Sequence, residues 1–215
     1  MKVLLVDDQA LFRSGLRMVI DSQADLAVVG EAADGESGRL AVRATQPDVV
    51  LMDIRMPGVD GIEGTERIVA DAQTRGVPAP RILVLTTFDL DEAAARAIRA
   101  GASGFVLKDA EPEFLLSAIR TIHAGTAVIA PSATSELFEH FGPGARGDAS
   151  ALSALSDRER EIFLLAARGL SNAEIAAHEF VSDATVKTHI SRILAKLSLR
   201  DRVQLVVFAH ERRLL

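Results

Sequence analysis

Short apolar runs alternate with longer amphipathic segments over the first 125 residues, and this alternation restricts the fold more than any other feature of the chain. The apolar runs predict strands near residues 2–6, 26–31, 48–52, 81–85 and 104–107. The amphipathic segments predict helices near 10–21, 35–46, 60–74, 90–100 and 112–124. Because each crossover between parallel strands requires a helix, the pattern indicates an α/β domain with a parallel, doubly wound sheet.

Polar side chains stand where four of these strands end. Asp7 and Asp8 follow the first strand, Asp53 the third, Thr86 the fourth and Lys108 the fifth. Ligands of such sheets bind at the carboxyl ends of the strands, so we expect these five side chains to meet. For a single residue such as Asp8, a polar strand end or a helix cap without a ligand is the simpler alternative.

The residue types at this edge favour phosphoryl chemistry. Three carboxylates would repel one another unless a cation lay between them, and oxygen ligands of this kind suit Mg²⁺. Lys108 would place charge on the oxygens of a phosphoryl group, and Thr86 would donate a hydrogen bond to them. We therefore expect the Asp53 carboxylate to attack a phosphoryl donor while Mg²⁺ neutralises the oxygens.

The charge of the chain changes sign along its length. Residues 1–150 carry 14 basic and 22 acidic side chains, a net charge of −8, whereas residues 151–215 carry 10 and 8, a net charge of +2. The second part can therefore become a nucleic-acid surface if its cations cluster. The chain has no cysteine, which excludes disulfides and thiolate zinc sites. Without a signal-peptide pattern or an apolar run near the roughly 18 residues of a membrane span, we expect a cytoplasmic protein.

Glycine and proline interrupt the alternation after residue 125, and residues 126–150 are predicted to form a linker with a short helix at 132–141. Residues 151–215 then show only helical periodicity, with four helices. Ser156 with Glu159, and Ser171 with Glu174, fit the capping box, and Ser182 caps a third helix. The turn between the second and third helices is tight, which predicts a helix-turn-helix.

Residues 182–198 form an amphipathic helix with one apolar side. That core side consists of Val186, Ile190, Ile193, Leu194 and Leu197. The opposite side presents Lys187, Thr188, Ser191 and Ala195, flanked by Thr185, His189, Arg192 and Lys196. Short polar residues with flanking cations suit a helix in a DNA major groove, because bulky groups would hold it away from the base edges. A solvated helix face is the alternative, which the tight turn and the local charge make less favourable.

Residues 1–125 resemble the receiver domain of two-component response regulators. The resemblance lies in DD at 7–8, VVLMD at 49–53, MPGVDG at 56–61, the strand end at Thr86 and GASGFVLK at 101–108. It implies the strand order 2-1-3-4-5 and an Asp53 that accepts phosphate from a sensor histidine kinase.

The same resemblance implies further roles. Asp8, Asp53 and the main-chain carbonyl of Arg55 would hold Mg²⁺, and Asp7 would support the ion through water. Thr86 and Phe105 match the switch pair, in which the hydroxyl turns to the phosphoryl group and the ring follows inward. Arg55 and Phe88 match variable positions that tune the lifetime of the phosphate.

Residues 152–215 resemble the LuxR-type helix-turn-helix domain. The matching motifs are LSDRERE at 155–161, RGLSNAEIA at 168–176 and VSDATVKTH at 181–189. The resemblance implies that Lys187, Thr188 and Ser191 face bases and that Thr185, His189, Arg192 and Lys196 contact phosphates. Ser198 replaces the glycine that commonly follows the recognition helix.

Together the two resemblances imply a transcription factor of the NarL/FixJ type. It would bind promoter DNA as a homodimer when active, with RNA polymerase as a further partner and no membrane contact. The last helix, near 201–213, has a second apolar face that indicates either self-association or packing within the chain.

Two other classes remain open. An Asp-nucleophile phosphatase or dehalogenase would use the same kind of sheet, but those enzymes resemble an Asp-x-Asp pattern, and Arg55 stands at the second position. A regulator that never uses its phosphate usually lacks one of the acids, the lysine or the hydroxyl, and none is missing here.

Overall fold

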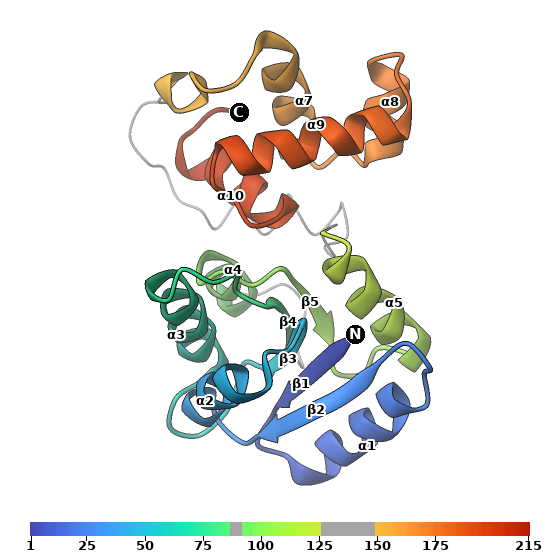
Figure 1. Ribbon diagram of the computed structural model, residues 1–215, viewed down its shortest axis with the longest axis vertical. Helices are drawn as coiled ribbons and strands as arrows, with labels where there is room; N and C mark the ends of the chain where they lie inside the picture. The colour runs from blue at the N-terminus through green and yellow to red at the C-terminus, as the bar shows by residue number, and fades with distance from the viewer. Residues whose placement is uncertain (87–91, 126–148) are drawn as a thin grey trace. The chain divides into compact units, whose positions relative to one another are not determined.

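The computed structural model describes residues 1–86, 92–125 and 149–215 (Figure 1). The chain divides into two compact units, Met1–Val128 and Ile129–Leu215. Phe88, the predicted short helix at 132–141 and most of the predicted linker lie outside the described residues, so these predictions and the domain boundaries built on them stay predictions. Within the described ranges, no helix combines the length and the apolar character that a membrane crossing requires.

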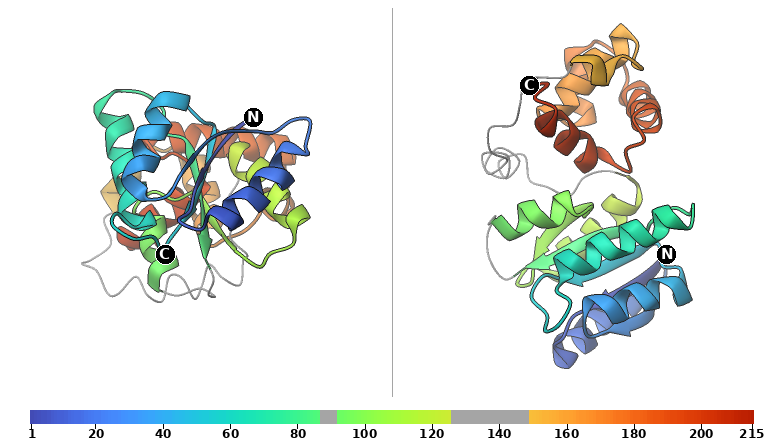
Figure 2. Two further views of the ribbon diagram at one scale, coloured as in Figure 1. Left: turned by 90° about the horizontal axis from the view of Figure 1, so that it is seen from below. Right: turned by 90° about the vertical axis from the view of Figure 1, so that its left-hand side faces the viewer.

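The first unit is an α/β sandwich around a five-stranded parallel sheet. The strands are β1 (Lys2–Val6), β2 (Ala27–Ala32), β3 (Val49–Asp53), β4 (Arg81–Thr86) and β5 (Gly104–Leu107). Their order is β2-β1-β3-β4-β5, and every pair is parallel, which confirms the expected topology. The helices are α1 (Ala10–Asp21), α2 (Gly35–Thr45), α3 (Gly61–Thr74), α4 (Glu92–Arg99) and α5 (Pro112–His123). Helices α1 and α5 cover one face of the sheet, and α2, α3 and α4 cover the other (Figures 1 and 2).

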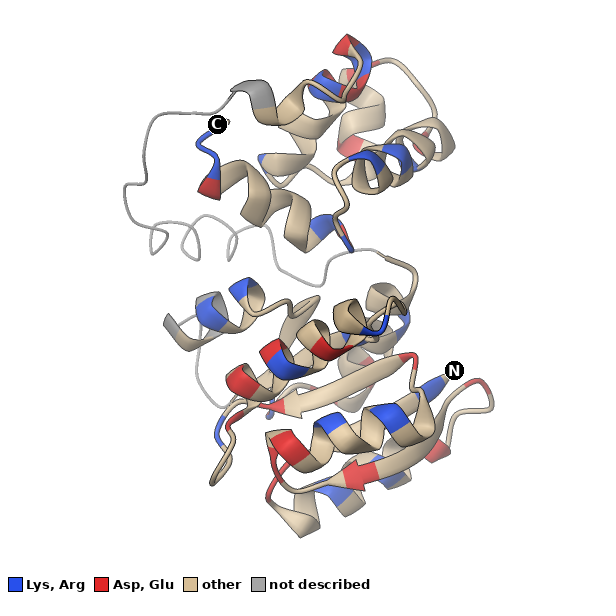
Figure 3. Ribbon diagram, turned by 60° about the vertical axis from the view of Figure 1, so that its left-hand side comes forward, with Lys and Arg blue, Asp and Glu red and all other residues tan. Residues whose placement is uncertain are grey.

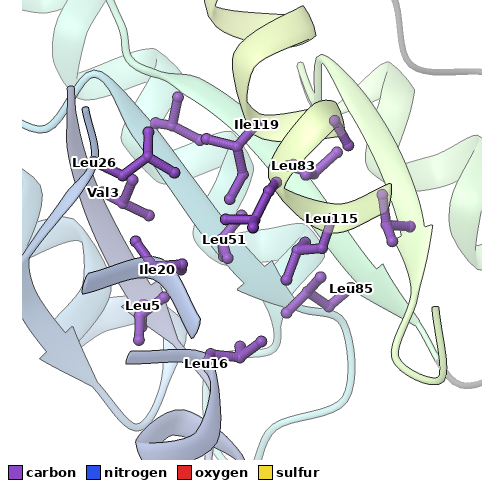
Figure 4. Packing of buried hydrophobic residues seen from close by; sticks show 14 of the residues in the cluster. Val3, Leu5, Leu16, Ile20, Leu26, Leu51, Leu83, Leu85, Leu115 and Ile119 are labelled. Carbon is purple, nitrogen blue, oxygen red and sulfur yellow. The ribbon is translucent and has the colours of Figure 1, made fainter. Parts of the chain in front are cut away.

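The core of this unit lies between the sheet and the helices α1 and α5 (Figure 4). Alternate strand residues such as Val3, Leu5 and Leu51 join Ile20 of α1 and Ile119 of α5 in one fully buried cluster. The strand residues between them are also buried and point to the opposite face. Truncating one such leucine to alanine typically costs about 2–5 kcal/mol of folding free energy. The strand ends are therefore carried by a well-packed sheet.

Aspartate caps start two helices on the α2–α3 side. The side chain of Asp34 accepts hydrogen bonds from Glu36 N and Ser37 N, and that of Asp60 accepts from Glu63 N. The third helix thus begins at Gly61, one residue later than predicted, because Asp60 is its N-cap. Acidic and basic residues are mixed along α2 and α3, where several of them pair across the two helices (Figure 3).

The second unit is entirely helical in its described part. A 3₁₀ helix at Ala149–Leu152 precedes α7 (Asp157–Ala167), α8 (Asn172–His178), α9 (Asp183–Lys196) and α10 (Arg202–Glu211). Both predicted capping boxes are present, and Ser182 caps α9 by accepting from Thr185 N. Ser198 has φ +55°, so the position after α9 requires the left-handed conformation that a glycine adopts without strain.

The last helix, α10, packs one of its two apolar faces into the helical unit. Leu205 and Ala209 join the core of that unit, and Phe208 packs against it. The linker against which the other face could pack lies outside the described residues, so self-association and packing within the chain both stay predictions.

Candidate functional site: an acidic cluster at the strand ends

The carboxyl ends of β1 and β3 bring three aspartates together. Oxygen atoms of Asp7, Asp8 and Asp53 lie within 4.8 Å of one another, and we call these three residues the acidic cluster. Asp7 and Asp53 are buried, with 1% and 4% of their surface exposed, whereas Asp8 is exposed. The acidic cluster thus combines two buried carboxylates with one that faces solvent.

Lys108 closes this cluster from the end of β5. Its Nζ atom lies 2.7 Å from Asp7 Oδ2 and 2.9 Å from Asp53 Oδ2, and it also stands 4.8 Å from the centre of the Phe12 ring. The side chain of Lys108 is only 9% exposed, which keeps these contacts out of bulk water. The predicted convergence of Asp7, Asp53 and Lys108 is thus found in the geometry.

Burial and neighbouring charges both shift the pKa values of Asp53 and Lys108. Burial raises the pKa of Asp53, and the charge of Asp7 raises it further, although Lys108 partly offsets both effects. For Lys108, burial lowers the pKa, but the hydrogen bonds and charges of Asp7 and Asp53 outweigh it and leave the pKa raised. The ammonium therefore stays charged, while the Asp53 carboxylate is poorly compensated.

The donor set fits a divalent cation. Three carboxylates against one ammonium leave two negative charges when all four groups are ionised. Asp7 Oδ2 is buried and lies in an ion pair with the Lys108 ammonium. Clustered carboxylate oxygens form the ligand set that Mg²⁺ prefers.

The other predicted residues of this site lie around the same edge. Thr86 is buried as the last residue of β4, opposite Leu107 in the sheet register. Arg55 follows β3 in an exposed turn, and its amide donates to Asp53 Oδ1 at 3.3 Å. Phe105 is half-buried, one position before Val106 of the α1–α5 core, so its ring points to the opposite face of the sheet.

Glycines that we did not single out hold the chain beside Asp53. A Cβ atom on Gly61 would stand 1.8 Å from the main-chain oxygen of Asp53. A Cβ on Gly64 would stand 2.8 Å from the Cα of Gly35, where α3 crosses the start of α2. The glycine that directly follows the N-cap Asp60 was the available signal, because helix starts rarely require one at the first position.

Helix α9 presents the predicted DNA-binding face to solvent. Its residues Val186, Ile190 and Ile193 are buried in the core of the helical unit, as the periodicity predicts. Lys187, Ser191 and Arg192 are exposed, and in the described part of the chain neither of the two cations forms a salt bridge.

Four other predicted contact residues are already engaged or partly covered. Lys196 pairs with the buried Glu159 at 2.6 Å. The Thr188 hydroxyl donates to the carbonyl of Ala184, and the Thr185 hydroxyl shares a hydrogen bond with Ser182. His189 is half-buried, and its Nδ1 atom has no hydrogen-bond partner among the described residues.

Comparison with known families agrees with both halves of the chain. Residues 3–120 match the family model of the response regulator receiver domain, and residues 153–209 match that of the bacterial regulatory proteins of the luxR family. The transcriptional regulatory protein YxjL of Bacillus subtilis is 42% identical over 97% of this chain and 94% of its own length. The oxygen regulatory protein NreC of Staphylococcus carnosus is 39% identical over 100% and 99%.

Solved structures show the same likeness. The response regulator ChrA of a heme-sensing two-component system is 36% identical and has a TM-score of 0.52, with 100% of this chain and 98% of that chain covered. A structure of two RcsB dimers bound to two parallel DNAs is 25% identical, with a TM-score of 0.54 and 98% of both chains covered.

These matches speak against the hydrolase class that the sequence left open. The relatives are transcription regulators and not hydrolases, and they match over nearly the whole chain. The chain therefore belongs to the two-component response regulators of the NarL/FixJ type, DNA-binding transcription regulators that join a receiver domain to a LuxR-type helix-turn-helix domain.

Proposed function

We propose that Asp53 accepts a phosphoryl group from a sensor histidine kinase in a Mg²⁺-dependent reaction, and that this controls dimerisation and promoter binding. The observation that carries the proposal is the position of Lys108, which bridges Asp7 and Asp53 while a third carboxylate lies within 4.8 Å. In this proposal Asp8, Asp53 and the main-chain carbonyl of Arg55 hold Mg²⁺, and Asp7 supports it through water.

The residues of the site divide the chemistry between them. A carboxylate oxygen of Asp53 forms a bond to phosphorus while the bond between phosphorus and the donor breaks. Lys108 directs its ammonium at the oxygens of the incoming group, and its raised pKa keeps it charged. Bound Mg²⁺ supplies the remaining positive charge. Burial raises the pKa of Asp53 and so disfavours its charged form, and a bound cation would stabilise that carboxylate.

Thr86 and Phe105 form the switch in this proposal. Thr86 is buried at the end of β4, next to the strand that carries Asp53, so its hydroxyl can turn toward a phosphoryl group there. Phe105 is half-buried, and in this proposal its ring follows inward when that hydroxyl turns away. Phosphorylation then shifts the population toward the conformation that pairs and binds DNA.

Helix α9 is the DNA-reading element of the proposed function. Lys187, Thr188 and Ser191 face base edges, and Thr185, His189 and Arg192 contact phosphates. Lys196 contributes less directly, because its ammonium is already paired with Glu159. RcsB binds DNA as dimers in the similar structure, and we infer that this chain likewise pairs on two half-sites. In this proposal the chain is a cytoplasmic protein with RNA polymerase as a further partner.

The test is labelling of the full chain by acetyl phosphate. The account predicts incorporation of one phosphoryl group per chain in Mg²⁺ and none when the metal is chelated. A regulator that works without phosphate would stay unlabelled under both conditions and would still bind its promoter DNA with unchanged affinity.

A further inference from the structure

Arginine 13 lies on the inner side of α1 and contacts the turn that carries two members of the acidic cluster. Its side chain is 16% exposed. The guanidinium donates one hydrogen bond through Nη1 to the main-chain carbonyl of Asp7. Its Nε donates a second to Glu31 Oε2 of β2 at 3.1 Å. One planar group thus connects the end of β1 to the neighbouring strand.

The turn from β1 into α1 has few other supports. The N-cap Gln9 makes no side-chain capping bond, and the first turn of α1 has no acidic residue. Asp7 N donates to Ala32 O at 3.1 Å, and Asp7 Oδ1 accepts from Gln9 N at 2.8 Å. Arg13 donates a hydrogen bond to the remaining polar main-chain atom of Asp7, its carbonyl oxygen. Among the described residues, Arg13 is therefore the side chain that donates a hydrogen bond to the peptide unit joining Asp7 to Asp8.

We propose that Arg13 is a positioning residue of the acidic cluster, which fixes the main chain between Asp7 and Asp8 and thereby strengthens Mg²⁺ binding. This inference rests on the proposed function for the Mg²⁺ site. It assigns to α1 a part in metal binding that none of its side chains performs by direct contact. Partners that orient metal ligands from outside the coordination sphere commonly change metal affinity by about 10- to 100-fold.

The positive charge of Arg13 works against this effect, so the two contributions have to be compared. A cation near the cluster repels Mg²⁺, but Glu31 neutralises the guanidinium through direct contact. Glu31 also pairs with Arg17 at 2.6 Å, and the two arginines hold the pKa of Glu31 below its usual range, so it stays ionised. Arg17 also pairs with Asp21 at 3.5 Å, so two carboxylates face the two guanidinium groups and little net charge remains. We therefore expect the geometric effect to be the larger one.

Arg13→Lys separates the effect of side-chain geometry on Mg²⁺ binding from the effect of charge. Lysine keeps the positive charge, but its single nitrogen cannot reproduce the planar fork that contacts a carbonyl and a carboxylate at once. Arg17→Ala is the matched control, because Arg17 also pairs with Glu31 from α1 but makes no contact with Asp7 among the described residues.

The experiment is a Mg²⁺ titration of the full chain and its variants, followed by the amide chemical shifts of the Asp7–Gln9 turn. Arg13→Ala and Arg13→Lys should both raise the Kd for Mg²⁺ by roughly tenfold. Arg17→Ala should stay within about twofold of the unmodified chain. In acetyl phosphate labelling, the half-saturating Mg²⁺ concentration should rise in parallel, while the rate at saturating Mg²⁺ changes little. Amide shifts of β4 and β5 that stay in place show that each variant keeps its fold.

Three results would overturn the inference. The first is an unchanged Kd for Mg²⁺ in Arg13→Ala. The second is an unchanged Kd in Arg13→Lys, which would assign the effect to charge. The third is an equal rise of the Kd in Arg17→Ala, which would assign the effect to the Glu31 ion pairs in general. Failure of the proposed function looks different. If the unmodified chain binds Mg²⁺ without being labelled, the phosphoacceptor role fails and the comparison of Kd values still tests Arg13. If it binds no Mg²⁺, the metal site and the role of Arg13 fail together.

Discussion

The acidic cluster and the exposed face of α9 differ in how far their function is built into the folded chain. At the cluster, Lys108 lies within 2.9 Å of two buried carboxylates. On α9, Lys187, Ser191 and Arg192 extend into solvent. A phosphoryl site needs fixed charges at short distances, whereas a DNA-reading face completes its contacts only on the partner. Substitutions at the acidic cluster should therefore change the stability of the fold, and substitutions on the exposed face of α9 should change the affinity for DNA.

The largest expected effect is at Gly61, beside the main-chain oxygen of Asp53. Gly61→Ala places a Cβ at 1.8 Å from that oxygen, and because the obstacle is backbone, the strand end must move. We expect a loss of about 3 kcal/mol in the free energy of unfolding, measured by urea denaturation, together with slower labelling.

Gly15→Ala is the matched control for this change. Gly15 lies within α1, and apart from the backbone of that helix no described atom lies within 4 Å of its Cβ position, so Gly15→Ala should stabilise the chain by about 0.4–1 kcal/mol. Equal behaviour of the two variants would show that the chain beside Asp53 is not tightly packed.

At α9 the expected effect falls on binding. Lys187→Ala should weaken binding to the chain's operator DNA by about 1–3 kcal/mol if Lys187 contacts a base, without changing the unfolding midpoint. Binding is measured by fluorescence anisotropy on a fragment selected by the full chain.

Lys196→Ala serves as the contrast on the same helix. It removes the partner of Glu159, whose pKa is held at about 2 by Lys196 and by the cap of α7, so it should lower stability more than DNA affinity. A larger loss of affinity in Lys196→Ala than in Lys187→Ala would reverse the assignment of the two lysines.

The smallest expected effect concerns the cost of the buried charge at Asp53. The pKa of this carboxyl is raised in the folded chain, so deprotonation favours unfolding, and stability falls as pH rises from the ordinary value of 3.8 through the folded value. Asp53→Asn should therefore stabilise the metal-free chain near pH 7 by on the order of 1 kcal/mol, and the gain should vanish near pH 4. Thermal unfolding in chelator at several pH values measures it. A gain that is independent of pH would assign it to packing.

The order of the strands was expected only from the resemblance to receiver domains. Periodicity predicted the parallel sheet, and short capping motifs predicted the two capping boxes, because both depend on local spacing. Periodicity also placed Asp7, Asp53, Thr86 and Lys108 at one edge, since the ends of parallel strands must meet there. It did not predict the contact of Arg13 with Asp7, because the direction of a long flexible side chain is not set by its position on a helix.

The same limit applies on the helical unit. The sequence placed Lys196 on the flank of the DNA-binding face, but its ammonium pairs with Glu159, 37 positions earlier in the chain. Gly61 and Gly64 were missed for a related reason, because a close approach between main chains leaves no apolar pattern in the sequence. Local sequence patterns do not predict which groups, distant in the chain, contact each other in the folded protein.

The most direct test of the account is the position of the phosphoryl group after treatment with acetyl phosphate and Mg²⁺. Peptide mapping by mass spectrometry should locate a single group on Asp53 in the unmodified chain, and Asp53→Asn should incorporate none. Stoichiometric label in Asp53→Asn, or a group mapped to another residue of the unmodified chain, would contradict the claim that the acidic cluster is built around Asp53 as phosphoacceptor.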